Sequence, residues 1–379
     1  MSRILTPLLV LILGQQIIAQ TSVVRVPNSG IQPQAEVDAD GTLHLIYFKG
    51  EPANGDLFYV NRVSGTEVFS QPVRVNQKPE SAVAMGTIRG AQLALGKNDR
   101  VHVAWMGSGK TAQKGSGKHP EHPMFYTRLD ESGTAFEPER NVMMWTGGLD
   151  GGGSVAADSL GNVFVAWHGS PPNNSDGETG RAMYVAVSRD DGATFRREDR
   201  ANPEPTGSCG CCGMRAFMDE NDHLHLLYRA ANKLSRDMTL LTSVDHGRAF
   251  SSQTVNRWFI QSCPMSSAVM ADHPRGLLIA TEVEGLLELS RVDALGKPPG
   301  KLSTLSPAKA KHASVATNQR GEILVAWAQN AGWAKGGELK WRLFDADGIP
   351  KSGEKSGAEL TTWSYPVVVT VGDEFVILY

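Results

Sequence analysis

Apolar and polar residues alternate in short runs along most of this chain. In Gly153–His168, which reads GSVAADSLGNVFVAWH, two such runs flank a turn that contains Asp158, Gly161 and Asn162. Alternation with a period of two residues is typical of a half-buried β-strand, and Asp, Gly and Asn favour tight turns. A third alternating run follows in Ala182–Phe195. The stretch therefore predicts a β-hairpin followed by a third strand.

The same hairpin pattern recurs at intervals of about fifty residues, which is a period typical of repeat architectures. The hairpins are Ala35–Phe48, Arg89–Trp105, Gly153–His168, Arg215–Arg229, Ser267–Glu282, Ala313–Trp327 and Tyr365–Tyr379. Units of this length with four antiparallel strands are typical of propeller blades. The sequence predicts an all-β fold, a β-propeller of four-stranded antiparallel blades. Seven blades are favoured, and a six-bladed ring with one hairpin outside it is the alternative.

The two ends of the chain carry further predictions. Because the chain stops after the last hairpin, we expect Val23–Val26 to complete the seventh blade and close the ring. At the start, Arg3, the apolar run Ile4–Leu13 and the small residue Ala19 are typical of a signal peptide, and the apolar run is too short to span a bilayer. We therefore expect residues 1–19 to be cleaved and residues 20–379 to form one propeller domain. The protein is then exported to the periplasm or the extracellular space.

Composition narrows the range of partners. The formal net charge is −3, from 37 basic and 40 acidic residues, so the chain lacks the basic excess of a nucleic-acid-binding protein. After the first residues no apolar stretch is long enough to span a membrane. The expected partner is a carbohydrate or another small molecule, and a protein partner is the alternative.

A charged turn follows the third strand in two successive units. It contains Ser188, Asp190, Gly192 and Phe195, in the spacing S-x-D-x-G-x-T-F, and the next unit repeats it with Ser243, Asp245, Gly247 and Phe250. A weaker copy with only the Gly and the Phe spans residues 130–136. The motif resembles the Asp-box (BNR) repeat of the sialidase/neuraminidase superfamily. The resemblance implies that these residues are structural and lie on the face opposite the ligand site.

The same resemblance points to candidate catalytic residues on that other face. Sialidases use an Arg trio, a Tyr paired with a Glu as nucleophile, and an Asp as acid/base; the first Arg stands in an Arg-Ile-Pro motif. Tyr365 matches the family's Tyr, and Glu282 and Glu284 are its candidate partners. Arg89 and Arg215 are candidates for two of the three arginines. The stretch at residues 29–33 reads SGIQP and has no Arg, so an exo-glycosidase activity of sialidase type stays open. His168 and Arg181 border a long loop on this face and are further candidate substrate-binding residues.

The four cysteines are the largest departure from that family. Cys209, Cys211 and Cys212 precede the fourth hairpin and Cys263 precedes the fifth, so we expect both segments in neighbouring loops. In an exported protein the first interpretation is a disulfide from Cys263 to one of the other three, and a second bridge from Cys209 to Cys212 is possible. No cofactor is expected on this interpretation. The alternative is a copper(I) or zinc site, with His312, His168 or Met265 nearby, although the spacing is not that of a zinc ribbon.

Three hypotheses follow from the sequence. The first is a sialidase-like protein that binds or hydrolyses extracellular glycans at the face opposite the Asp-box turns. The second is a non-catalytic propeller that binds a protein partner. The third is a metal or redox protein centred on the cysteines.

Overall fold

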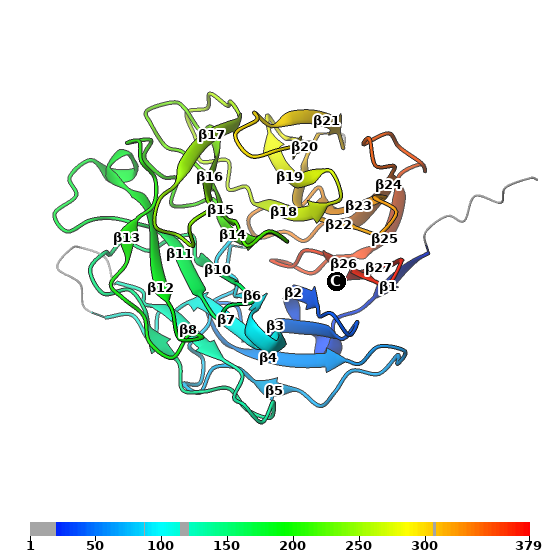
Figure 1. The fold of residues 1–379 in the computed structure, drawn as a ribbon, viewed down its shortest axis with the longest axis horizontal. Coiled ribbons are helices and arrows are strands. Elements are labelled where there is room, and N and C mark those ends of the chain that lie inside the picture. Colours follow the sequence, from blue (N-terminus) through cyan, green and yellow to red (C-terminus); the bar gives the residue numbers. More distant parts are fainter. Residues whose placement is uncertain (1–19, 87, 114–120, 306–307) are drawn as a thin grey trace, which may run out of the picture.

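A ring of seven β-sheets surrounds a central axis in the computed structural model, which describes residues 20–86, 88–113, 121–305 and 308–379. The first strand of each sheet lies nearest the axis (Figure 1). The predicted seven-bladed β-propeller is therefore confirmed. In the part of the chain that the structure describes, the helical segments are three short 3-10 turns: η1 (Pro27–Ser29), η2 (Lys97–Asp99) and η3 (Gly177–Gly180).

Six of the blades contain four antiparallel strands, ordered along the chain from the axis outward. The first three are β2 (Ile31–Val37), β3 (Leu43–Glu51), β4 (Asn54–Arg62) and β5 (Val73–Arg74); β6 (Gln92–Leu95), β7 (Val101–Met106), β8 (Met124–Arg128) and β9 (Arg140–Asn141); and β10 (Gly153–Ala157), β11 (Val163–Gly169), β12 (Ala182–Ser188) and β13 (Asp199–Arg200). The next three are β14 (Arg215–Met218), β15 (Leu224–Arg229), β16 (Met238–Ser243) and β17 (Ser251–Asn256); β18 (Ala268–His273), β19 (Gly276–Val283), β20 (Leu286–Val292) and β21 (Gly300–Thr304); and β22 (Ala310–Thr317), β23 (Ile323–Gln329), β24 (Glu338–Phe344) and β25 (Lys355–Glu359).

The seventh blade joins the two ends of the described chain. It consists of β26 (Val367–Val371), β27 (Glu374–Leu378) and β1 (Thr21–Val24). This hairpin lies inside the ring, because β26 contacts both β22 and β2, which excludes the six-bladed alternative. The N-terminal strand closes the ring as predicted, but β1 pairs in parallel with β27 as a third strand. β1 therefore covers the edge that β27 would otherwise expose (Figure 1).

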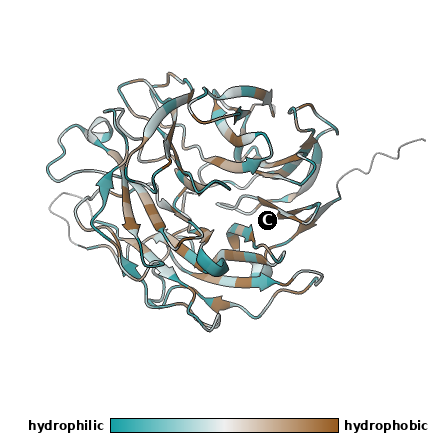
Figure 2. Cartoon of the chain, viewed as in Figure 1, coloured by the Kyte–Doolittle hydropathy of each residue, from teal (hydrophilic) through white to brown (hydrophobic). Residues whose placement is uncertain are grey.

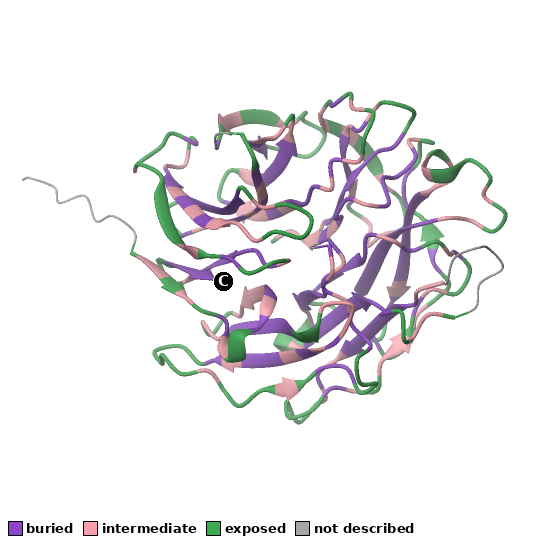
Figure 3. Ribbon diagram, turned by 180° about the vertical axis from the view of Figure 1, so that it is seen from behind, coloured by how far each residue is buried: buried purple, intermediate pink, exposed green. Residues whose placement is uncertain are grey.

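The hydrophobic core is divided among the interfaces between blades. Seven apolar clusters fill the seven interfaces, and hydrophobic residues are spread along the strands of the blades (Figure 2). Every residue of β11 is buried, because each sheet packs between two neighbouring sheets (Figure 3). The indole side chains of Trp105, Trp167 and Trp327 lie on second strands and are at most 1 % exposed.

Blade topology separates two ends of the propeller. One end carries the turns within each hairpin and the turns between third and fourth strands. The two kinds of turn contact each other there: the N–H of Asp191, between β12 and β13, donates to the carbonyl of Gly161, between β10 and β11 (2.8 Å). The longer loops lie at the other end, which we call the loop face. They join second to third strands and one blade to the next, and they include Cys209–Cys212. The predicted signal peptide falls on residues 1–19, outside the described residues, and no helix among the described residues is long and apolar enough to cross a membrane.

The two charged turns are held by hydrogen bonds within each turn. The Ser188 hydroxyl donates to Asp190 (2.7 Å) and accepts from the Gly192 N–H (2.8 Å). The second turn repeats both contacts, Ser243 with Asp245 (2.7 Å) and Gly247 with Ser243 (2.8 Å). The Phe195 ring packs edge-on against Tyr126 of the preceding blade, with 4.7 Å between ring centroids. These side chains face away from the loop face and are engaged locally.

Removing the carboxylate of Asp190 is expected to loosen its turn. Asp190 accepts the N–H and the hydroxyl of Thr194, at 2.8 and 2.6 Å. By analogy with loss of a helix-capping side chain, Asp190→Ala should lower the free energy of unfolding by about 0.5–2 kcal/mol and leave ligand binding unchanged. Urea unfolding measures the effect, with Asp199→Ala, exposed on the same blade, as the matched control. A loss of ligand binding with unchanged stability would contradict the assignment of the faces.

Candidate functional site

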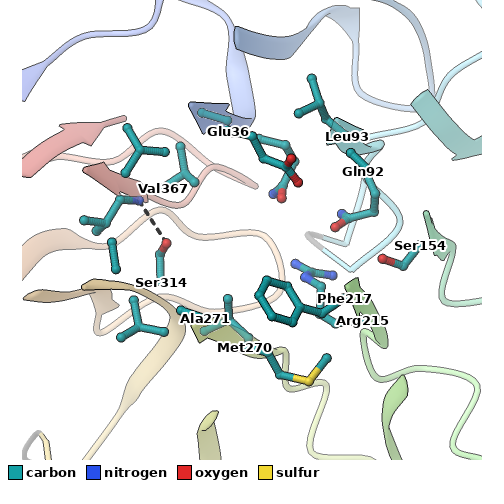
Figure 4. A pocket seen from close by; sticks show the side chains of 18 of the residues that line it. Glu36, Gln92, Leu93, Ser154, Arg215, Phe217, Met270, Ala271, Ser314 and Val367 are labelled. Atoms are coloured by element: carbon teal, nitrogen blue, oxygen red, sulfur yellow. Dashed lines mark hydrogen bonds between the residues drawn. The ribbon is translucent and has the colours of Figure 1, made fainter. Parts of the chain in front are cut away.

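A cavity of about 440 Å³ runs along the axis and is lined by the first strands of all seven blades. Polar side chains gather where these strands begin, at the loop face. They are Gln34, Gln92, Ser154, Arg215, Ser267, His312 and Tyr365. The first strand is the inner edge of each sheet, so consecutive residues of these strands line the channel. In Figure 4 the Gln92 amide and the Arg215 guanidinium point toward the same part of the cavity.

Arg215 brings a positive charge to the loop-face end of the channel. Its one described hydrogen bond runs from Nη1 to the carbonyl of the adjacent Met214 (3.0 Å). Among the described residues, no carboxylate lies within ion-pair distance of this guanidinium. Burial lowers the pKa of Arg215, while the neighbouring Tyr365 raises it, and a guanidinium stays protonated in proteins. Most of its N–H donors are therefore free to bind a ligand in the channel.

Tyr365 and His312 form a neutral wall beside Arg215. The Tyr365 hydroxyl accepts a hydrogen bond from the Gln34 amide (3.2 Å), and its ring lies 5.7 Å from the His312 ring. Burial raises the pKa of Tyr365, so the side chain stays a phenol at neutral pH. Burial, followed by the charges of Lys311 and Arg215, lowers the pKa of His312 to about 3, so this imidazole is neutral as well.

The backbone directs His312 toward the axis. His312 has φ 54°, in the left-handed region that non-glycine residues rarely adopt. It lies where the register of β22 shifts between Lys311 and Ser314, which is an irregularity of β-bulge type. Its Nδ1 lies 3.0 Å from the Ser267 hydroxyl. Strained backbone of this kind persists where surrounding contacts enforce it, often at binding sites.

Two carboxyl groups line the channel further from the loop face. Burial raises the pKa of Glu36 to about 7, against a smaller opposing effect of the hydrogen bond from the Leu95 N–H (2.9 Å). Burial, followed by the negative charge of Glu220, raises the pKa of Asp272 to about 7. Both side chains are half-buried, because they face the channel while protein surrounds it. Each can change protonation near neutral pH.

Titration of Glu36 predicts a pH-dependent stability. The pKa is raised on folding from 4.5 to about 7, so the stabilising contribution of the protonated group is present below pH 4.5 and is lost as pH rises to about 7. The difference in unfolding free energy, Glu36→Gln minus wild type, should therefore grow by about 2 kcal/mol from pH 4.5 to pH 8, allowing for screening by channel water. Urea unfolding of both proteins at several pH values measures it. A difference that does not change with pH would contradict this assignment.

The predicted nucleophile pair is not brought together. Glu282 is 4 % exposed, and its carboxylate lies 3.4 Å from Lys311 Nζ. It lines a second cavity of about 440 Å³ on the loop face, together with Lys309, Lys311 and Lys335. Lys311 and the adjacent His312 separate this cavity from the channel that Tyr365 lines. Among the described residues, no contact joins Tyr365 to Glu282.

Arg89 lies outside the channel, and its guanidinium is already engaged. It forms an ion pair with Asp150 (2.7 Å), donates to the carbonyls of Asp150 (2.6 Å) and Met85 (3.1 Å), and lies 5.7 Å from the Trp333 ring centre. The segment that carries it passes over the loop-face end of the channel, since a Cβ on Gly90 would lie 3.2 Å from the Tyr365 hydroxyl. Of the two arginines predicted from the sequence, only Arg215 faces the channel.

His168 and Arg181 flank the cysteine loop. His168 Nε2 accepts the Gly151 N–H (3.0 Å), and burial, followed by the charge of Arg181, lowers its pKa to about 3. Arg181 lies against the loop backbone, because a Cβ on Gly210 would meet its Nη1 at 1.5 Å. Both residues therefore lie beside the cysteines, on the loop face, and neither lines the axial channel.

A disulfide joins the two cysteine-bearing loops, as one interpretation of the sequence predicted. It links Cys211 to Cys263, and Cys209 and Cys212 are buried free thiols. The second bridge considered from the sequence, between Cys209 and Cys212, is not formed; their sulfur atoms lie 3.5 Å apart.

Several channel residues were missed by the sequence analysis. Gln34, Gln92, Ser267, Glu36 and Asp272 carry no motif and lie at inward positions of first strands. The signal that could have found them is polarity at every second residue of a first strand, where Gln34 and Glu36 stand two residues apart.

Comparisons with solved structures give the same architecture. A Hadza microbial sialidase aligns with a TM-score of 0.55 and 14 % identity, over 85 % of this chain and 70 % of the sialidase. A Penicillium chrysogenum α-L-arabinanase, complexed with arabinobiose, has a TM-score of 0.54 and 13 % identity over 86 % and 96 % of the two chains. A Fusarium graminearum α-L-arabinofuranosidase aligns with a TM-score of 0.54 and 12 % identity, over 86 % of this chain and 98 % of the arabinofuranosidase. Identities this low show a shared fold. No family model and no curated protein matches the sequence.

Proposed function

We propose that this chain is an exported, divergent sialidase-like propeller that binds an acidic sugar at the loop-face end of its axial channel. The observation that carries the proposal is the Arg215 guanidinium, which lines the channel with most of its donors unused. Arginine binds a carboxylate through two parallel charge-assisted hydrogen bonds, which fix orientation as well as charge. An acidic sugar supplies such a carboxylate.

The rest of the channel suits a carbohydrate. Tyr365, Gln34, Gln92 and Ser267 present neutral donors and acceptors for sugar hydroxyls, beside the imidazole of His312. A cavity of about 440 Å³ lies within the usual range for small-ligand sites. The similar folds named above belong to a sialidase, an arabinanase and an arabinofuranosidase, which supports a glycan as the ligand class.

Binding is the activity that the geometry favours over hydrolysis. A sialidase-type nucleophile needs a carboxylate beside the tyrosine, whereas Glu282 pairs with Lys311 in a different cavity. Tyr365 is a buried phenol with a raised pKa. Glu36 and Asp272, each with a pKa of about 7, are the channel groups suited to proton transfer if a bond is cleaved.

Calorimetric titration of the purified protein tests the proposal. N-acetylneuraminic acid and glucuronic acid are compared with the neutral sugars arabinose and galactose at the same pH. We expect saturable 1:1 binding of at least one acidic sugar and affinity at least about tenfold weaker for the neutral ones, since the charge-assisted bond is worth more than 1.4 kcal/mol. Equal binding of neutral sugars, or no binding of any, would contradict it. Fluorogenic sialosides and a glycoside panel measure turnover in the same samples.

Export is a separate part of the proposal. It rests on the apolar run Ile4–Leu13 and on the disulfide between Cys211 and Cys263, a bond that persists in oxidising compartments. Mass analysis of the protein recovered outside the cytoplasm should give a chain that begins at Gln20. Recovery of only the uncleaved chain inside the cell would contradict export.

A further inference from the structure

A carboxylate and two imidazoles meet at the hairpin turn of the fourth blade, at the end of the propeller opposite the loop face. They belong to Asp219, His223 and His225. The Asp219 Oδ2 atom lies 3.0 Å from His223 Nδ1 and 3.2 Å from His225 Nε2, and the three atoms all lie within 4.8 Å of one another. None of these residues lines the axial channel or belongs to the disulfide.

The backbone of the turn brings these side chains together. His225 lies in β15 and His223 directly precedes that strand, so the two rings, two positions apart, point to the same side. The Asp219 Oδ1 atom accepts the backbone N–H groups of Asn221 (3.0 Å) and His223 (2.8 Å). These two contacts fix the carboxylate with Oδ2 beside both imidazoles.

The first blade contains the same turn without the third side chain. Asp38 accepts the Thr42 N–H (2.7 Å), and its other oxygen lies 3.0 Å from His44 Nε2. The turn therefore forms with one aspartate and one histidine. His223 stands where the first blade has Thr42, so its imidazole is an addition that the turn itself does not require.

The distances between the three side chains suit a zinc ion. Zinc binds carboxylate oxygen and imidazole nitrogen at about 2.0–2.2 Å, so neighbouring ligand atoms in a tetrahedron lie about 3.3 Å apart. The two separations from Asp219 Oδ2, 3.0 and 3.2 Å, are close to that edge. Two histidines and one carboxylate leave the fourth position of the tetrahedron open for water or a ligand.

An ion can reach this position from solvent. The side chains of Asp219 and His223 are 12 % and 21 % exposed, whereas that of His225 is 4 % exposed. The charge of Asp219 acts on Asp272, which lines the axial channel, so the site lies close to the end of the channel opposite the loop face. The Thr242 hydroxyl lies 3.0 Å from His225 Nδ1, where it can accept the ring proton while Nε2 binds a metal.

We infer that Asp219, His223 and His225 form a zinc(II) site with one open coordination position. On binding, the two imidazoles exchange their hydrogen bonds to Asp219 for bonds to the metal, and each neutral ring keeps its proton on the other nitrogen. The carboxylate offsets one of the two positive charges of the ion. The site is independent of the sugar site at Arg215.

Zinc titration of the full chain, cleared of metal with a chelator and dialysed, tests the inference. A fluorescent chelator competes for zinc at neutral pH, and cobalt(II) replaces zinc in a parallel sample. We expect one metal per chain and cobalt d–d bands without thiolate charge-transfer bands, which would report binding at the thiols of Cys209 and Cys212 instead. His223→Thr, which introduces the residue of the first blade, should weaken zinc binding by on the order of a hundredfold. Thermal unfolding of the metal-free variant checks that it folds, and zinc should raise the midpoint of the wild type alone.

The matched control removes another histidine that contacts an aspartate. His246 Nδ1 lies 3.2 Å from Asp158 Oδ2 at the same end of the propeller, and its φ of 57° favours asparagine as the replacement. His246→Asn should leave zinc binding unchanged. Wild-type zinc affinity in His223→Thr would overturn the inference. So would an equal loss in both variants, thiolate charge-transfer bands with cobalt, or no saturable zinc binding by the wild type.

Discussion

The Arg215→Met variant is expected to bind an acidic sugar at least about a hundredfold more weakly than the wild type. Arg215 is the charged donor at the loop-face end of the channel and has one described hydrogen bond, to the carbonyl of Met214. Two charge-assisted hydrogen bonds to a carboxylate contribute about 3 kcal/mol or more, which corresponds to that loss. Titration calorimetry with the acidic sugar measures it.

Two companion variants separate charge from geometry. Arg215→Lys keeps the positive charge but cannot form the bidentate contact, so its affinity should fall between those of wild type and Arg215→Met. Arg74→Met, on the outermost strand of its blade, should bind as the wild type does. Unchanged affinity in Arg215→Met would show that the acidic sugar does not bind in the channel.

Truncation of Trp167 is expected to give the largest loss of stability. The indole is fully buried between two blades, and its N–H donates to the Thr146 hydroxyl (3.0 Å). Trp167→Ala leaves a large cavity and removes the hydrogen bond to Thr146, so the free energy of unfolding should fall by about 3–5 kcal/mol. Urea unfolding measures the change. Trp145→Ala, at a side chain that is 42 % exposed, is the control and should lose much less. Equal losses would contradict the blade-interface core.

The blade repeat could be predicted because it depends on local patterns. Alternating runs and turn residues mark each hairpin, and a short period repeated seven times leaves few architectures. The parallel pairing of β1 with β27 could not be predicted, because either orientation of Val23–Val26 presents the same alternation. The closed ring decides that pairing, and closure is a property of the whole chain.

The candidate site could be predicted only in part. Arg215 and Tyr365 begin first strands, so the hairpin pattern alone places both at the axis. Arg89 lies in a loop, and alternation does not predict the course of a loop. Glu282 lies near the end of the second strand β19 and pairs with Lys311 of the next blade in a separate cavity. Glu36 was missed because the sequence does not distinguish a charged residue that faces the channel from one on a solvent-exposed face of a strand.

The pairing of the cysteines could also be predicted only in part. Their positions in consecutive blade-to-blade loops predicted that Cys263 would meet the triplet, and the disulfide to Cys211 confirms a bridge between these loops. Which of the three cysteines pairs with Cys263 depends on the conformation of the turn between Cys209 and Cys212, where the Cys212 N–H donates to the Cys209 carbonyl. Alternation along strands carries no information on such a turn.

The most direct test of the sugar site is a crystal structure of the protein soaked with the tightest-binding acidic sugar. We expect the carboxylate of the sugar within about 3 Å of the Arg215 guanidinium, with the sugar ring beside Tyr365 and His312. A sugar bound at the opposite end of the propeller, or on the loop face without contact to Arg215, would contradict it.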